Sequence, residues 1–83
     1  MDTFNAYELR ICGLEHLISF AAARWELFAF PEVRDLARGH GRHRFDVLYE
    51  GDQADPDAWC RRLTGAGYPA KPLGRVDNTG KAA

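Results

Sequence analysis

The spacing of apolar and polar residues changes twice in the first third of the chain. Over residues 7–12 apolar and polar side chains alternate, apart from the last residue, and a period of two is typical of a half-buried strand. Gly13 interrupts this pattern. Over residues 14–30 the apolar side chains recur at helical spacing, and Pro31 ends the run because proline cannot continue a helix. The pattern therefore predicts a short strand, a glycine turn and a long helix.

The predicted helix is unusual because it is apolar on two nearly opposite faces. At about 100° per residue, one apolar face suits packing on a sheet. A helix that is apolar nearly all round must be covered nearly all round, and the rest of an 83-residue chain offers little to cover it with. The inner face consists of Phe20, Ala23, Leu27 and Phe30, and the outer face consists of Ile18, Ala21, Ala22, Trp25, Phe28 and Ala29.

A hairpin follows the helix. Residues 33–38 have a weak strand pattern, residues 39–43 (Gly-His-Gly-Arg-His) suit a hairpin tip, and residues 44–50 have a strong strand pattern. The third strand alternates so that its apolar residues share one face. These residues are Phe45, Val47 and Tyr49.

The last third of the chain predicts a capped helix and an edge strand. Asp55 is placed to cap the helix, Pro56 suits its first turn, and Gly67 ends it. Residues 68–73 suit a last strand, and two prolines confine it to the edge of a sheet. The buried stripe of this helix is predicted to be Trp59, Leu63 and Ala66.

The order of elements, β-α-β-β-α-β, predicts an α+β fold of the ferredoxin-like type. This fold is a sandwich of a four-stranded antiparallel sheet with two helices on one face. Right-handed crossovers place the first and third strands in the middle. They also gather three loops, residues 13–19, 39–43 and 67–68, at one end of the molecule. We expect a single domain over residues 1–73 and a disordered polar tail over 74–83.

Composition and charge exclude several classes of function. A net charge of −1 creates no field that would attract nucleic acid or a membrane. The N-terminus lacks the features of a signal peptide, and the apolar helix is too short and too charged to span a bilayer. Two cysteines are too few for a disulfide scaffold, so we expect free thiols and a cytoplasmic protein. Because the sequence has no nucleophile motif and no phosphate loop, we do not expect an enzyme.

Four segments together resemble a heavy-metal-associated domain, the small fold of copper chaperones and of N-terminal modules of metal pumps. Residues 13–14 (Gly-Leu) stand at the family's Gly-Met, and residues 30–33 (Phe-Pro-Glu-Val) at its Leu-Pro-Gly-Val. Residues 47–50 (Val-Leu-Tyr-Glu) stand at Val-x-Tyr-Asp, and residues 66–70 (Ala-Gly-Tyr-Pro-Ala) at Ala-Gly-Tyr-x-Ala. Residues 7–73 follow this pattern with no gap in either helix. The resemblance implies the same ferredoxin-like fold.

The chain departs from the family at the metal site. In the family, a Cys-x-x-Cys pair at the start of the first helix binds a soft ion such as Cu(I). Counted back from Pro31, these two positions fall on His16 and Ser19. An imidazole and a hydroxyl do not suit Cu(I), so we do not expect this chain to transfer copper as the family does.

A different metal site is an alternative. Cys12 precedes His16 by four residues, and the fold would bring His40, His43 and Tyr68 to the same end. Such ligands suit a harder ion, such as Zn(II), Ni(II) or Cu(II). The opposing interpretation is that His16 is an ordinary polar residue at a helix start and that the hairpin histidines are solvated. Strand alternation also aims Cys12 at the open face of the sheet.

Two segments are strongly charged. The hairpin is basic and could meet an acidic partner, but Phe45 is its only aromatic residue, so nucleic acid is not an expected partner. The acidic residues around the second helix start suit capping and interaction with the helix dipole. The basic residues are Arg34, Arg38, Arg42 and Arg44, and the acidic ones are Glu50, Asp52, Asp55 and Asp57.

These observations leave three hypotheses, the last of which is a contact of the arginine-rich hairpin with nucleic acid or an acidic partner. The favoured one is a non-catalytic binding module without the family's soft-metal site, which acts through the outer helix face as a homodimer or with a partner protein. The interface would consist of Ile18, Ala21, Ala22, Trp25 and Phe28. The alternative is an atypical divalent-metal-binding or metallochaperone-like protein that uses His16 with Cys12 or the hairpin histidines.

Overall fold

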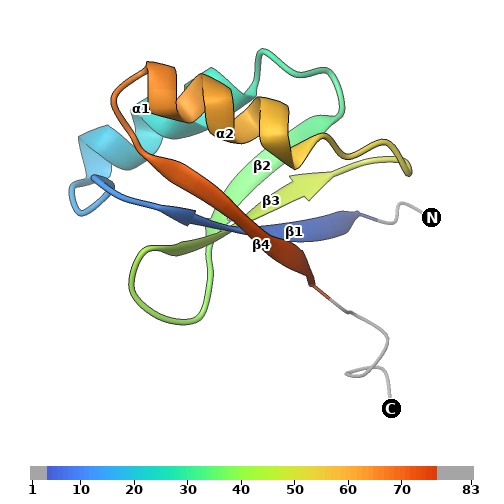
Figure 1. Ribbon diagram of the computed structural model, residues 1–83, viewed down its shortest axis with the longest axis horizontal. Coiled ribbons are helices and arrows are strands. Elements are labelled where there is room, and N and C mark those ends of the chain that lie inside the picture. Colours follow the sequence, from blue (N-terminus) through green and yellow to red (C-terminus); the bar gives the residue numbers. More distant parts are fainter. Residues whose placement is uncertain (1–3, 77–83) are drawn as a thin grey trace.

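The computed structural model describes residues 4–76 (Figure 1). Its six elements follow one another in the predicted order. Within the described residues, neither helix is long and apolar enough to cross a membrane. The elements are β1 (Asn5–Ile11), α1 (Leu17–Leu27), β2 (Val33–Arg38), β3 (Arg44–Tyr49), α2 (Pro56–Gly65) and β4 (Ala70–Val76).

The four strands form one antiparallel sheet in the order β2-β3-β1-β4, so β1 and β3 lie in the middle, as predicted. Both helices cover the same face of this sheet (Figure 1). The ferredoxin-like α+β fold is therefore confirmed. β4 is an edge strand, as its one proline, Pro72, requires, and its pairing with β1 shifts register between Glu8 and Leu9.

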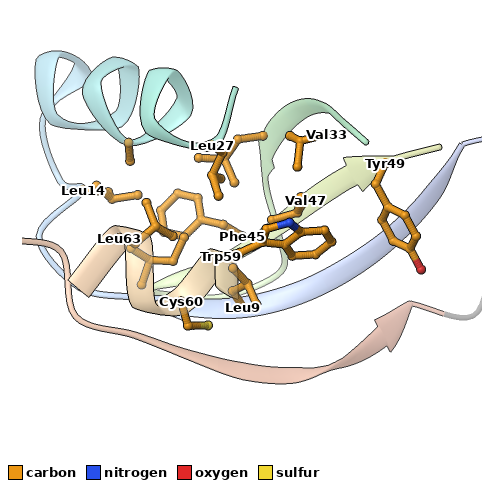
Figure 2. Close-up of a cluster of buried hydrophobic side chains, with 13 residues drawn as sticks. Leu9, Leu14, Leu27, Val33, Phe45, Val47, Tyr49, Trp59, Cys60 and Leu63 are labelled. Atoms are coloured by element: carbon orange, nitrogen blue, oxygen red, sulfur yellow. The ribbon is translucent and has the colours of Figure 1, made fainter. Parts of the chain in front are cut away.

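The core lies between the sheet and the two helices (Figure 2). Trp59 of α2 is its largest fully buried side chain, with ring centroids 5.5 Å from Tyr49 and 6.2 Å from Tyr7. The indole Nε1 donates a 2.9 Å hydrogen bond to Glu32 Oε2, just before β2. Trp59 thus ties α2 to the sheet and to the segment that follows α1. Other side chains with 0% exposure are Leu9, Ile11, Ala23, Leu27, Val47 and Leu63.

The predicted limits of the first helix are wrong, because α1 begins three residues later and ends three residues earlier. Gly13 has a φ of +91°, and the helix starts only after His16, whose φ of −102° and ψ of 149° are extended. Leu14 is still buried, but it enters the core from this loop. At the other end, Pro31 disfavours helical backbone at the residue before it, and a turn forms instead.

Other predicted bounds shift by one or two residues. β1 begins at Asn5 and leaves Cys12 outside the strand, and β3 does not include Glu50. Asp55 caps α2 as predicted, since its carboxylate accepts a 3.2 Å hydrogen bond from the N–H of Ala58. Ala66 was expected to be buried, but it is exposed because it is the C-cap, one position after the end of α2.

β4 lies later in the chain than predicted. It covers Ala70–Val76 rather than residues 68–73, and its last three residues pair with β1. Disorder at residues 74–76 was therefore a wrong expectation. Hydrogen bonds from the neighbouring strand order a segment whose own sequence has a weak strand pattern. Residues 77–83 of the expected tail lie outside the described residues.

Candidate functional site

The outer surface of α1 is apolar and open to solvent. Ile18 is 83% exposed, Leu17 is 78% exposed and Trp25 is 74% exposed. Phe28, just after the helix, is 36% exposed, and its ring meets that of Trp25 edge to face with centroids 6.4 Å apart. Two alanines lie between these ends of the surface. We call this set the exposed α1 face: Leu17, Ile18, Ala21, Ala22, Trp25 and Phe28.

The sequence placed five of these six residues on the outer face of the helix, and α1 does turn them away from the core. Ala23 and Leu27, which were predicted to face the sheet, are fully buried. Leu17 was missed. At about 100° per residue it lies about 20° from Phe28 around the helix axis, so the same periodicity could have found it.

Ion pairs border the exposed α1 face on both sides. Toward β2, Arg24 hydrogen-bonds Asp35 and holds its guanidinium 4.8 Å from the ring centroid of Phe28. This hydrogen bond lowers the pKa of Asp35. Toward α2, Nε of Arg62 donates a 2.8 Å hydrogen bond to Oε1 of Glu26. The two pairs attach α1 to its neighbours and leave the apolar strip between them uncovered.

The loop after β1 carries His16 and Ser19, the positions that the resemblance noted above aligns with a pair of metal ligands. His16 is exposed, and its side chain makes no capping hydrogen bond to α1. Ser19 is half-buried in the first turn of the helix. Cys12 is half-buried just beyond β1, where its backbone N–H donates a 2.9 Å hydrogen bond to the carbonyl oxygen of Pro69.

The three loops expected at one end of the molecule do lie together. The backbone N–H of Ile11 donates a 2.8 Å hydrogen bond to the carbonyl oxygen of His43 in the hairpin. Nδ1 of His43 is 3.9 Å from Oε2 of Glu15. A Cβ added to Gly13 would lie 3.4 Å from Cδ1 of Tyr68, so the loop before α1 also contacts the turn before β4.

The structure does not bring three of the predicted metal ligands together at one point. Among residues 4–76, no three His, Cys, Asp or Glu side chains lie close enough to hold an ion. Metal binding by a smaller group of these residues stays a prediction; the residues are His16, Cys12, His40 and His43. The other cysteine, Cys60, lies in the core, and burial raises the pKa of its thiol to about 11. Cys12 is therefore the only cysteine at this end of the described residues. A single thiol does not supply the thiolate pair that Cu(I) needs.

The arginines of the basic hairpin contact rings and carboxylates. The guanidinium of Arg38 lies 5.2 Å from the ring centroid of Phe20 and 5.8 Å from that of Phe45. Arg34, at the start of β2, hydrogen-bonds Glu50 and lowers the pKa of that carboxylate. These contacts give at least two of the hairpin arginines a structural role at the rim of the core.

Comparison with known structures identifies the fold. No protein-family model matches the sequence, and no curated protein matches it significantly. A copper-binding domain of the P-type ATPase HMA7 matches with a TM-score of 0.72 at 14% identity, covering 88% of this chain and 99% of that domain. The chain has a heavy-metal-associated-like fold.

Two further structures agree with this result. The N-terminal domain of a potential copper-translocating P-type ATPase from Bacillus subtilis, in its Cu(I)-loaded state, has a TM-score of 0.72 at 17% identity, covering 92% of this chain and 95% of that one. The Cu(I)-loaded first domain of the human copper chaperone for SOD1 has a TM-score of 0.67 at 17% identity, covering 90% of this chain and 100% of that domain. At these identities the likeness is one of fold.

Proposed function

We propose that this chain is a non-catalytic, cytoplasmic binding module with a heavy-metal-associated-like fold, which acts through the exposed α1 face. In this proposal the face binds a protein surface, either on a second copy of the chain or on a different partner, and it replaces the family's Cys-x-x-Cys site as the functional surface. The observation that carries the proposal is the exposure of Leu17, Ile18 and Trp25, each at least 74%.

Exposure of this kind is unfavourable unless the surface serves an interface. Burying one large apolar side chain is worth about 1.5–3 kcal/mol. Single exposed apolar residues are common, but a contiguous apolar patch on a small protein marks an interaction site. Here the exposed residues recur on one side of one helix, and ion pairs on both sides supply the polar rim that is typical of interfaces.

Photo-cross-linking in cells tests this proposal in the full chain. A photoreactive amino acid at the position of Ile18 or Trp25 should give a discrete cross-linked product. Matched positions at Asp52, in the loop before α2, and at Lys71, on the edge strand β4, are also exposed and should give only background. Adding Trp25→Glu to the position-18 variant should abolish the product while circular dichroism stays unchanged. Equal yields at the face and control positions, or a product that survives Trp25→Glu, would overturn the proposal.

Divalent-metal binding is a second candidate. It is favoured by the imidazole of His16, which is exposed, makes no capping hydrogen bond to α1 and lies at the end of the fold where the loops meet. His16 would act with Cys12 or with the hairpin residues His40 and His43 on Zn(II), Ni(II) or Cu(II). Native mass spectrometry after titration with each ion tests this candidate. Stoichiometric binding that is lost in His16→Ala supports it, and equal binding by both proteins excludes it.

A further inference from the structure

We infer that the partner of the exposed α1 face is a second copy of this chain, and that two copies pack α1 against α1 in an antiparallel, two-fold arrangement centred near Ala21. The inference rests on the proposed function and adds the identity and the geometry of the partner. Such an interface uses the same surface on both chains, so it closes after two copies.

The sizes of the side chains along the face favour this arrangement. Large residues stand at both ends, with Leu17 and Ile18 at the start and Trp25 and Phe28 at the end. The alanines lie between them. Where two helices cross, the distance between their axes depends on the side chains at the contact, and small residues there allow close approach. Away from the crossing the helices diverge, and the large residues at each end fill the widening gap.

The antiparallel direction matches large residues with complementary partners. With the two-fold axis near Ala21, Trp25 of one copy lies level with Leu17 and Ile18 of the other. In a parallel pair Trp25 would instead face its own counterpart, so the largest side chains of the two copies would meet each other.

The available area suits a weak dimer. Aromatic side chains present roughly 200 Å² each and aliphatic ones roughly 100 Å², so the exposed fractions in the structure give about 400 Å² of apolar surface per chain. At an apolar share of about 65%, the interface is about 600 Å² per chain and 1,200 Å² in total, the lower limit for specific interfaces. We therefore expect dissociation in the micromolar range rather than below it.

Residues 77–83, which follow β4, are a poor alternative occupant of the exposed α1 face. Residues 77–83 (Asp-Asn-Thr-Gly-Lys-Ala-Ala) contain no aromatic or large aliphatic side chain. They offer nothing that could replace water over an indole. A second copy supplies a surface of matching size and apolar character.

Sedimentation equilibrium and fluorescence of the purified chain test the inference. In a Trp59→Phe variant Trp25 is the only tryptophan, and its emission should shift to the blue as the chain is concentrated and dimers form. Trp25→Ala, measured by sedimentation in the otherwise unmodified chain, should raise the dissociation constant at least about tenfold, as for a tryptophan that an interface buries. Leu73→Ala is the matched control, because Leu73 is apolar and 46% exposed but lies on β4. It should leave association unchanged.

Disulfide cross-linking in a Cys12→Ser background tests the geometry. Ala21→Cys lies near the two-fold axis and should cross-link to its counterpart under mild oxidation. Phe28→Cys should not, because a rise of 1.5 Å per residue separates the two copies of that position by about 20 Å, well beyond the reach of a disulfide. Cross-linking at Phe28→Cys would indicate a parallel pair and overturn the geometry.

Other outcomes separate this inference from the proposed function. A chain that stays monomeric up to near-millimolar concentration overturns the second-copy inference. A cellular cross-link to a product of different mass would then leave the proposed function standing with another partner. If dimers form only after residues 77–83 are deleted, those residues are the occupant of the face and the inference is wrong.

Discussion

Trp59→Ala should destabilise this protein far more than the same change at Trp25. Trp59 is 0% exposed, so the substitution removes roughly 200 Å² of buried apolar surface, which corresponds to about 5 kcal/mol at 25 cal/mol per Å². It also removes the hydrogen bond to Glu32. Buried tryptophan-to-alanine changes lie at about 3–5 kcal/mol. A chain of 83 residues is stable by roughly 4–12 kcal/mol, so this side chain accounts for at least about a quarter of its stability.

The same arithmetic gives a small effect at Trp25. With 74% of its surface exposed, the side chain buries only about 50 Å², worth about 1.3 kcal/mol. Alanine is the better helix former by about 0.5 kcal/mol, which offsets part of this loss. We therefore expect Trp25→Ala to lower the free energy of unfolding by less than about 1 kcal/mol. The two variants should differ by at least about 2 kcal/mol.

Urea unfolding followed by far-ultraviolet circular dichroism measures both variants, because this signal does not depend on tryptophan. Low protein concentration excludes any contribution from association. Trp59→Phe serves as an intermediate variant if Trp59→Ala does not fold. Its free energy of unfolding should fall by about 1–2 kcal/mol, because phenylalanine cannot donate the hydrogen bond to Glu32. Equal losses at Trp25 and Trp59 would refute the assignment of one tryptophan to the core and the other to the surface.

Three further predictions concern other parts of the fold. Burial, together with the charge of the cross-strand neighbour Glu8, raises the pKa of Asp46. The charged form of Asp46 therefore destabilises the fold as the pH rises above about 4. Asp46→Asn should stabilise the protein by about 0.5 kcal/mol at pH 7 and should not stabilise it at pH 3. In the native protein Cys12 should react with a thiol reagent at pH 8, and Cys60, whose pKa is about 11, should react only after unfolding. Gly13→Ala should lower stability by about 1 kcal/mol in thermal unfolding, because the φ of Gly13 is +91°.

Each of these predictions can fail in a defined way. Stabilisation by Asp46→Asn that persists at pH 3 would show that charge is not the cause. Rapid reaction of both thiols in the folded protein would contradict the burial of Cys60. An unchanged melting temperature in Gly13→Ala would mean that the loop before α1 accepts another backbone conformation.

The order of elements could be predicted because its signals are local. Alternation before Gly13, helical spacing up to Pro31 and the prolines near β4 each depend on neighbouring residues alone. The sequence predicted the first and last residues of the elements less accurately, because these depend on which residues the whole fold buries. Leu14 has the spacing of a helical residue, yet it reaches the core from a loop.

The exposed α1 face and the metal ligands differed in how far the sequence could predict them. The face follows from helical spacing once the inner face is known, so Trp25 could be placed correctly. The positions of His16 and His43 depend on how the loop and the hairpin pack against each other. That packing is set by contacts distant in sequence, such as the hydrogen bond from Ile11 to His43, which no pattern in the sequence reveals.

The two edges of the sheet limit how large any assembly of this protein can become. β4 lacks one backbone donor at Pro72, carries Lys71 and Arg75, and is offset by the register shift in its pairing with β1. β2, at the other edge, has its own register shift before Asp35. Irregular, charged edges resist the addition of strands from other chains. Fibres that grow by adding strands to the edges of the sheet are therefore disfavoured, and concentrated solutions should contain small, closed oligomers.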